Sequence, residues 1–289
     1  MKNLVYLLVL SIVFTACEDV IDVDLDQGES QLVVDAFVTS DSSIQYIRLT
    51  KSADYFLNAP TPAVIDAQVR IVGPANQVYT FVSNNNGDFT YNPVTNGPID
   101  SIGFPYRLEI TYNNIPYQAT STLNPVPPID SITSSFEEAE LGAEEGYYAQ
   151  FWARDFAGRE DFYWVKAYRN NLPLYPNDPS IIILSQDAAF GGNAADGFVF
   201  ILPLRAAITD EEEPYIVGDT TSVEIFSINK DVFEFLEQAS IQANNGGLFS
   251  TPPANIRSNI KDGAGNAQEE VLGVFSMSAV SRASKIIEP

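Results

Sequence analysis

Short segments of alternating apolar and polar residues, separated by turn residues, dominate residues 31–122 and restrict the fold more than any other feature. In Ile44–Lys51, the residues Ile47 and Leu49 alternate with polar neighbours, which predicts a strand with one buried face. Asn113-Asn114 separates two such segments and predicts a hairpin, because Asn tolerates positive φ. About seven such segments predict an immunoglobulin-like or transthyretin-like β-sandwich over residues 31–124. The clearest segments are residues 31–38, 44–51, 67–72, 77–82, 104–112 and 115–122.

A proline-rich stretch, Leu123–Pro128, ends this unit. Its prolines cannot donate backbone hydrogen bonds to a sheet, so we expect a domain boundary there and a larger β-rich domain over residues 129–289. One short helix is expected, Lys230–Ala243, with Asn229 at its N-cap and a stripe of apolar residues. The expected strands are residues 129–136, 147–154, 162–169, 181–184, 197–202, 222–228 and 270–280. The predicted fold class is therefore mostly β.

The N-terminus has the features of a lipoprotein signal peptide. Lys2 precedes an apolar run, Leu4–Phe14, which is too short to span a bilayer comfortably. Phe14-Thr15-Ala16-Cys17 resembles a bacterial lipobox, in which the cysteine is acylated after cleavage. We therefore expect residues 1–16 to be removed and Cys17, the sole cysteine, to carry diacylglycerol and fatty acyl chains that anchor the protein. The alternative is an ordinary secreted protein with an unrelated cysteine.

Residues 17–30 form an acidic tether in this interpretation. Glu18 and Asp19 follow the cysteine directly and resemble the export signal of Bacteroidota lipoproteins that reach the outer face of the outer membrane. The alternative is a solvated tether that is acidic by composition alone. The following aspartates are spaced like those of a calcium loop, but Gln27 and Val33 stand where the loop requires glycine and glutamate. We therefore expect no metal there.

The composition excludes several classes of function. The chain has no histidine, one cysteine, and 38 acidic against 15 basic residues. Zinc sites and histidine-dependent nucleophiles cannot be built in the usual way, and no disulfide can form within the chain. The strong negative charge opposes binding to nucleic acid phosphates. We therefore expect no catalytic residues, no metal and no cofactor beyond the acyl chains on Cys17.

Four pieces of sequence follow one another along the chain: the acidic stretch with residues 32–36, residues 67–71 with 87–89, residues 106–110 with 117–120, and residues 253–260 with 272–275. In this order they resemble the uncharacterised Bacteroidota lipoproteins grouped as domain-of-unknown-function family 4249. The likeness covers nearly the whole mature chain, although Val274 stands where relatives usually have an aromatic residue. The resemblance implies an extracellular accessory lipoprotein of a TonB-dependent outer-membrane transporter, and it supplies no catalytic residues.

An aromatic cluster at residues 147–175 is the candidate contact surface for a ligand or partner. Trp152, Trp164 and Tyr175 are its chosen members, because such rings stack on ligands and also form hydrogen bonds. The alternative is a role in the core. Residues 162–169 are apolar on both faces, which predicts a strand buried twice, at the domain junction.

These observations favour a non-enzymatic accessory or ligand-capturing subunit of a transport complex, anchored in the outer membrane and facing the exterior. Two alternatives remain open, a carboxylate hydrolase of surface polysaccharide and an adhesin or structural surface protein. Paired carboxylates could act as acid and base. However, the runs at residues 137–145 and 210–213 have the pattern of solvated surface loops.

Overall fold

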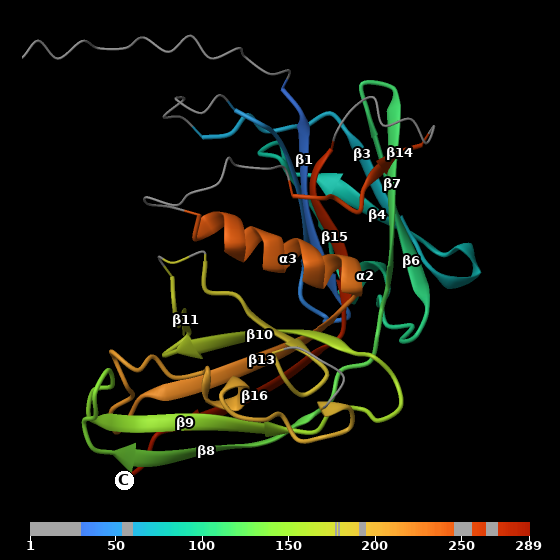
Figure 1. The fold of residues 1–289 in the computed structure, drawn as a ribbon. Coiled ribbons are helices and arrows are strands. Elements are labelled where there is room, and N and C mark those ends of the chain that lie inside the picture. The colour runs from blue at the N-terminus through green and yellow to red at the C-terminus, as the bar shows by residue number, and fades with distance from the viewer. Residues whose placement is uncertain are drawn as a thin grey trace, which may run out of the picture.

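The structure is a computed structural model that describes residues 30–53, 60–176, 178, 180–190, 195–245, 256–263 and 271–289. It is mostly β, as predicted. Figure 1 shows a curled sheet joined to a second layered β unit, with the long helix α3 beside the place where they meet.

The curled sheet has nine strands in the order β14-β7-β6-β3-β4-β5-β2-β1-β15. Neighbouring strands are antiparallel except for β1 and β15, which pair in parallel. The six segments given from the sequence correspond to β1–β4, β6 and β7, whereas β5 was not among them. Its strands are β1 (Leu32–Thr39), β2 (Gln45–Lys51), β3 (Gln68–Val72), β4 (Val78–Ser83), β5 (Asp88–Tyr91), β6 (Pro105–Tyr112), β7 (Ile115–Thr122), β14 (Lys261–Asp262) and β15 (Leu272–Ser278).

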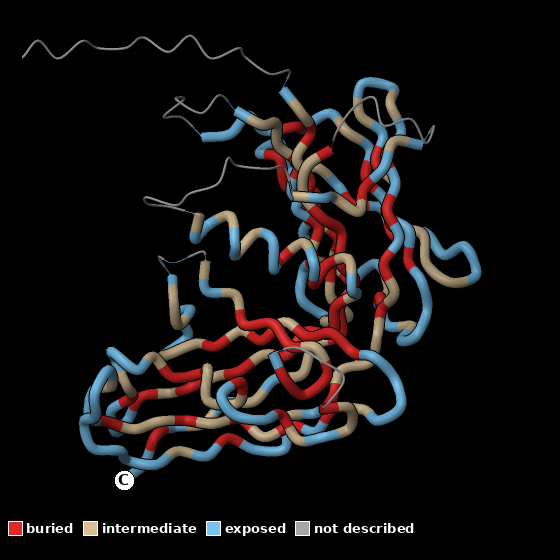
Figure 2. The backbone as a smooth tube through the Cα atoms, in the orientation of Figure 1, coloured by how far each residue is buried: buried red, intermediate tan, exposed pale blue. Residues whose placement is uncertain are grey.

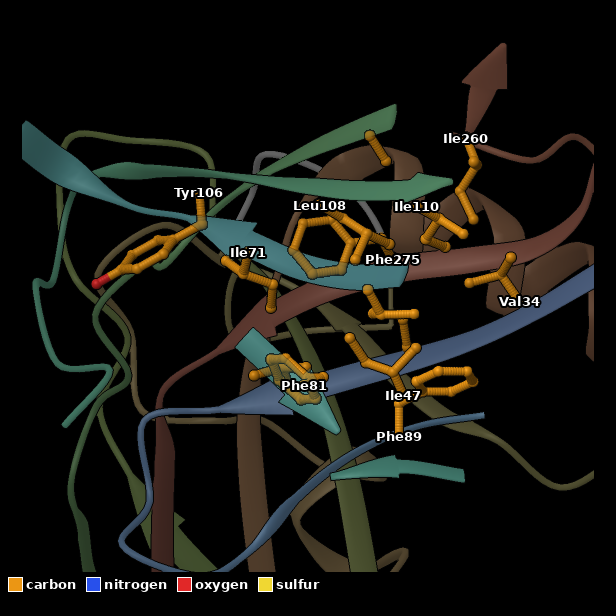
Figure 3. Packing of buried hydrophobic residues seen from close by; sticks show 14 of the residues in the cluster. Val34, Ile47, Ile71, Phe81, Phe89, Tyr106, Leu108, Ile110, Ile260 and Phe275 are labelled. Carbon is orange, nitrogen blue, oxygen red and sulfur yellow. The ribbon is translucent and has the colours of Figure 1, made fainter. Parts of the chain in front are cut away.

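Alternation along these strands places one face of the curled sheet in a single apolar core (Figure 3). Ile47 and Leu49 are fully buried there, as predicted. The β6–β7 hairpin turns at Asn113 and Asn114, with φ of 51° and 65°, which confirms the predicted turn. The sheet curls until β7 lies beside β15, where the Met277 N–H donates to Ser121 Oγ at 2.9 Å.

The predicted division of the chain at residues 124–129 is incomplete. The strands β14 and β15 come from the C-terminal part, yet they belong to the curled sheet and supply part of its core. Composition and periodicity predict an apolar strand near residues 270–280, but they do not identify its pairing partner. That partner is β1, more than two hundred residues earlier in the chain.

The second unit is a sheet covered by a hairpin. The strand order is β11-β10-β13-β16, and β12 also pairs with β10. The hairpin of β8 (Ile129–Glu137) and β9 (Gly146–Ala153) packs on one face through a second apolar core. Residues 197–202 form only one isolated bridge, from Val199 to Arg154, so the strand predicted there is wrong. The sheet strands are β10 (Phe162–Arg169), β11 (Leu172–Pro173), β12 (Ile183–Gln186), β13 (Thr220–Ile228) and β16 (Val280–Ile286).

Helix α3 (Lys230–Ala243) has the predicted bounds and covers the junction of the two units. Val232, Phe233 and Leu236 are its buried residues. Asn229 is at the N-cap position, but its side chain does not cap the helix and instead lies 2.8 Å from Ser121 Oγ. Figure 2 shows buried residues continuing along the strands through this junction. The short helices are α2 (Pro93–Asn96), η1 (Pro74–Asn76) and η3 (Leu204–Ala206).

Candidate functional site

One face of the second sheet meets the outer face of β1 at a corner, which we call the corner groove. The register of β10, β13 and β16 arranges its side chains in three rows across the strands. Since side chains alternate along a strand, every second residue contributes to this face. The rows are an apolar one of Trp164, Phe226 and Val280, a charged one of Lys166, Glu224 and Arg282, and a hydroxyl-bearing one of Tyr168, Ser222 and Ser284.

The apolar row joins the two units. The ring of Trp164 lies 5.2 Å from that of Phe37 on β1 and 5.8 Å from that of Phe226, measured between centroids. On the other face of β10, Tyr163 and Val165 are buried in the second core. Strand β10 is therefore covered on both faces at the junction, as its sequence predicted.

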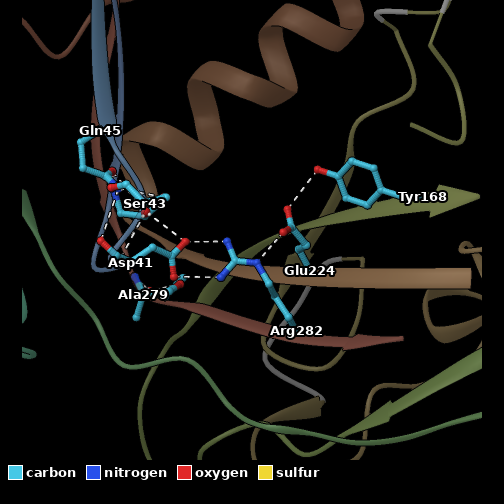
Figure 4. A network of polar contacts seen from close by, with 9 residues as sticks. Asp41, Ser43, Gln45, Tyr168, Glu224, Ala279 and Arg282 are labelled. Carbon is cyan, nitrogen blue, oxygen red and sulfur yellow. Dashed lines mark hydrogen bonds and ion pairs between the residues drawn. The ribbon is translucent and has the colours of Figure 1, made fainter. Parts of the chain in front are cut away.

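Ion pairs fix the charged row at its outer end (Figure 4). Arg282 donates to Glu224 from Nε and to Asp41 from Nη1, the latter at 2.8 Å. These hydrogen bonds raise the pKa of the guanidinium, chiefly through Asp41. The hydroxyl of Tyr168 donates to the other oxygen of Glu224 at 3.0 Å, and burial together with this carboxylate raises the pKa of Tyr168. Both carboxylates are therefore held by their neighbours.

Lys166 occupies the inner end of the charged row. Its Nζ lies 3.8 Å from the ring centroid of Trp164 and 4.7 Å from that of Phe226. Such contacts with aromatic faces stabilise a cation that has lost part of its hydration. Burial lowers the pKa of Lys166, while Glu224 and Asp35 oppose this change. The side chain of Lys166 forms no hydrogen bond or ion pair with any residue that the structure describes.

Asp35 borders the same corner from β1, on the face that also carries Phe37. It is accessible to solvent, yet the surrounding protein displaces enough water to raise the pKa of its carboxyl group against the opposing effects of Arg48 and Lys166. Arg48 is itself paired with Asp88, at 2.6 Å. Within the described ranges the carboxylate of Asp35 forms neither a hydrogen bond nor an ion pair. The groove therefore presents a cation and a carboxylate that do not satisfy each other.

The hydroxyl-bearing row opens into a hollow of about 490 Å³, a size that accepts a small ligand. Its side chains donate and accept hydrogen bonds, and it borders the charged row through Glu224 and Arg282. The polar residues that line it are Tyr168, Asn171, Ser222, Glu224, Arg282 and Ser284.

A second hollow of about 680 Å³ lies on the curled sheet across β3, β4, β6 and β7. Its charged residues are already paired, because Glu109 accepts hydrogen bonds from Arg70 at 2.6 Å and from Arg107 at 2.8 Å. These pairs lower the pKa of Glu109 although burial alone would raise it. The corner groove is the stronger candidate because it retains unsatisfied charges.

The three aromatic residues chosen from the sequence lie in three separate places. Trp164 is in the corner groove. Trp152 is on the outer face of the β8–β9 hairpin, where it donates to Thr133 Oγ1 at 2.8 Å and lies under Arg205. Tyr175 is half-buried in the loop after β11, and burial raises its pKa to about 12. The lipidation and export residues Cys17, Glu18 and Asp19 lie outside the described residues.

Buried carboxylates occur in the turns between β9, β10 and β12. The hydroxyl of Tyr163 donates to Asp155 at 2.6 Å, and the Asp161 N–H donates to Asp187 at 2.9 Å. Burial raises the pKa of Asp161 and of Asp187. These carboxylates hold the turns in place and line neither of the two hollows described above.

The acidic loops at residues 137–145 and 210–213 lie side by side, joined by a hydrogen bond from the Glu144 N–H to the Glu211 carbonyl at 2.9 Å. Their glutamates are exposed. In the part of the chain that the structure describes, no group of three acidic, histidine or cysteine residues is arranged to hold a metal ion.

Reasoning from the sequence missed four of the residues that shape the groove, namely Asp35, Asp41, Glu224 and Arg282. A usable signal was present for the first, since Asp35 interrupts the apolar run of residues 32–38. The other three belong to segments that are far apart in sequence and meet only through the sheet register.

Comparison with known proteins identifies the family of this chain. Among the described residues, no helix is both long and apolar enough to cross a membrane. A comparison with curated proteins gave no match. The family model described as Domain of unknown function (DUF4249) matches residues 18–284, which includes every strand of both units except the last two residues of β16. The chain therefore belongs to the DUF4249 family.

Proposed function

We propose that this protein is a lipoprotein anchored in the outer membrane through Cys17, facing the cell exterior, and that it captures a ligand as a non-enzymatic accessory subunit of a TonB-dependent transport complex. The location is supported by the sole cysteine after the apolar run Leu4–Phe14 and by the acidic pair that follows it. Several acyl chains on one cysteine are enough for stable anchoring.

The observation that carries the capturing role is the corner groove. Glu224 and Asp41 are engaged by Arg282, and Tyr168 occupies the remaining oxygen of Glu224. Groups fixed in this way are suited to recognition, because a general acid or base must be free to exchange its proton with the substrate. The row of hydroxyl-bearing residues beside them adds neutral hydrogen-bonding partners.

The test is a gentle-detergent purification of the tagged lipoprotein from its native outer membrane, with mass spectrometry of the proteins that copurify. We expect a β-barrel transporter in stoichiometric amount. The matched control is Cys17→Ser, which removes the acyl chains and leaves both β units unchanged. Recovery of the acylated protein alone would refute an obligate role as a subunit.

A carboxylate hydrolase is the second candidate function, and Asp35 is the observation that favours it. Its carboxyl group is accessible and has a raised pKa, as a general acid requires. A hydrolase would release new reducing ends from surface polysaccharide, and Asp35→Asn would abolish that release. Equal and low release by the wild type and by this variant would eliminate the hydrolase.

A further inference from the structure

The corner groove has a pattern of charges and hydroxyl groups that selects among ligand classes. Asp35 lies on the same face of β1 as Phe37, whose ring is 5.2 Å from that of Trp164, and the Lys166 Nζ lies 3.8 Å from the Trp164 centroid. Their side chains therefore border one corner, but within the described residues they form no ion pair. Each therefore remains able to bond to a ligand. A hydroxyl group both donates and accepts, so one hydroxyl can accept from the Lys166 ammonium and donate to the Asp35 carboxylate.

The charge balance argues against an ionic ligand. Three carboxylates border the groove, those of Asp35, Asp41 and Glu224, against two cations, Lys166 and Arg282. Arg282 is already shared between two of the carboxylates. An anion would meet an excess of negative charge, on a chain whose net charge is −23. A cation would meet the Lys166 ammonium at the inner end.

The neighbouring hydroxyl-bearing row also favours an uncharged ligand. Ser222 and Ser284 present neutral hydroxyl groups, and the aromatic ring of Tyr168 lines the same hollow. An aromatic ring provides an apolar surface beside these polar groups. A ligand that carries many hydroxyl groups on a carbon framework matches all three features.

We infer that the corner groove binds a neutral, hydroxyl-rich ligand of the saccharide class, with its hydroxyl groups bridging Lys166 and Asp35 and contacting Ser222 and Ser284. This inference rests on the proposed ligand-capturing role and names the chemistry of the ligand.

The test uses the full acylated lipoprotein, purified in detergent, on an array of neutral glycans together with sulfated and uronic-acid glycans. We expect binding to neutral members of the array. The affinity for the best neutral glycan is then measured by calorimetry. Lys166→Met removes the charged hydrogen-bond donor and keeps an unbranched apolar side chain of similar length, and we expect binding about tenfold weaker or more.

The matched control is Lys285→Met. Lys285 is on β16, but its neighbours Arg282 and Ser284 alternate with it, so it lies on the opposite face of the strand. This control is expected to bind like the wild type. Ser284→Ala removes an exposed hydroxyl from the hollow without affecting the core, so it tests the same inference if Lys166→Met folds poorly.

Three outcomes would overturn the inference: no binding to the array, binding to charged glycans only, or neutral-glycan binding that neither Lys166→Met nor Ser284→Ala weakens. These outcomes are separable from failure of the proposed function. A transporter that copurifies with a protein that binds no glycan would support the accessory role and remove the saccharide. A protein that is purified without a transporter but binds neutral glycans would support the saccharide ligand and refute the obligate accessory role.

Discussion

Gly273 on β15 is the position where substitution should damage this fold most clearly. It pairs with Val34 of β1 in the parallel ladder and has φ of 94°. A Cβ atom at this position would overlap the carbonyl oxygen of Val34 and lie 2.8 Å from its carbonyl carbon. The substitution Gly273→Ala must therefore push β15 away from β1, in addition to straining its own backbone.

The expected cost follows from these two effects. An alanine with this positive φ costs about 1–2 kcal/mol. Forcing an extra carbon into a packed interface costs roughly another 1–3 kcal/mol, and displaced ladder hydrogen bonds each contribute about 0.5–1.5 kcal/mol. We expect a loss of about 3–5 kcal/mol in the free energy of unfolding, a large share of the roughly 5–15 kcal/mol typical of folded proteins.

Gly218→Ala isolates the steric part of this effect. Gly218 has nearly the same φ, 95°, but nothing lies within 4 Å of the position that its Cβ would occupy. Urea unfolding followed by circular dichroism should give a loss of about 1–2 kcal/mol for this control, the backbone strain alone. If the two variants unfold at the same urea concentration, the close approach of β15 to β1 is wrong.

Three further variants test other parts of the structure. The pKa of Asp35 is raised in the folded protein, so its ionisation lowers the stability of the fold as pH rises through that pKa. Asp35→Asn should therefore be more stable than the wild type at pH 7 and lose this advantage below about pH 4, as measured by thermal melts across pH. Tyr163→Phe removes the buried hydrogen bond to Asp155 and should cost about 1.5–3 kcal/mol in urea unfolding, whereas an unchanged midpoint would contradict that bond. Leu236→Ala should cost about 2–5 kcal/mol by loss of packing under α3, with the exposed-site variant Glu237→Ala as its control.

Local features of the fold were predictable because local sequence determines them. The bounds of α3 follow from an apolar stripe at helical spacing and from the asparagines and glycines beyond it. The hairpin at Asn113 and Asn114 follows from the tolerance of Asn for positive φ. The double burial of β10 follows from apolar residues at both odd and even positions.

Long-range pairing was not predictable from the same patterns. The apolar composition of β15 predicts a buried strand, but it is equally compatible with either sheet. The corner groove depends on this pairing and on the register of β10, β13 and β16, because these bring Asp35, Lys166 and Arg282 to one place. No single segment contains a motif for the site. The clearest local signal in the sequence is Asp35, a charged residue within an apolar strand.

The return of the last strands to the first sheet also governs when the molecule can fold. As the chain emerges from its N-terminus, β1 appears early, but its parallel partner β15 is among the last segments to appear. Until then β1 keeps an open edge, which in other proteins invites pairing with foreign strands. Contacts between such distant segments also slow folding, because a long loop must close before they form. The first sheet can therefore not be completed until nearly the whole length of the chain is available, and the closing of β15 onto β1 completes the nine strands.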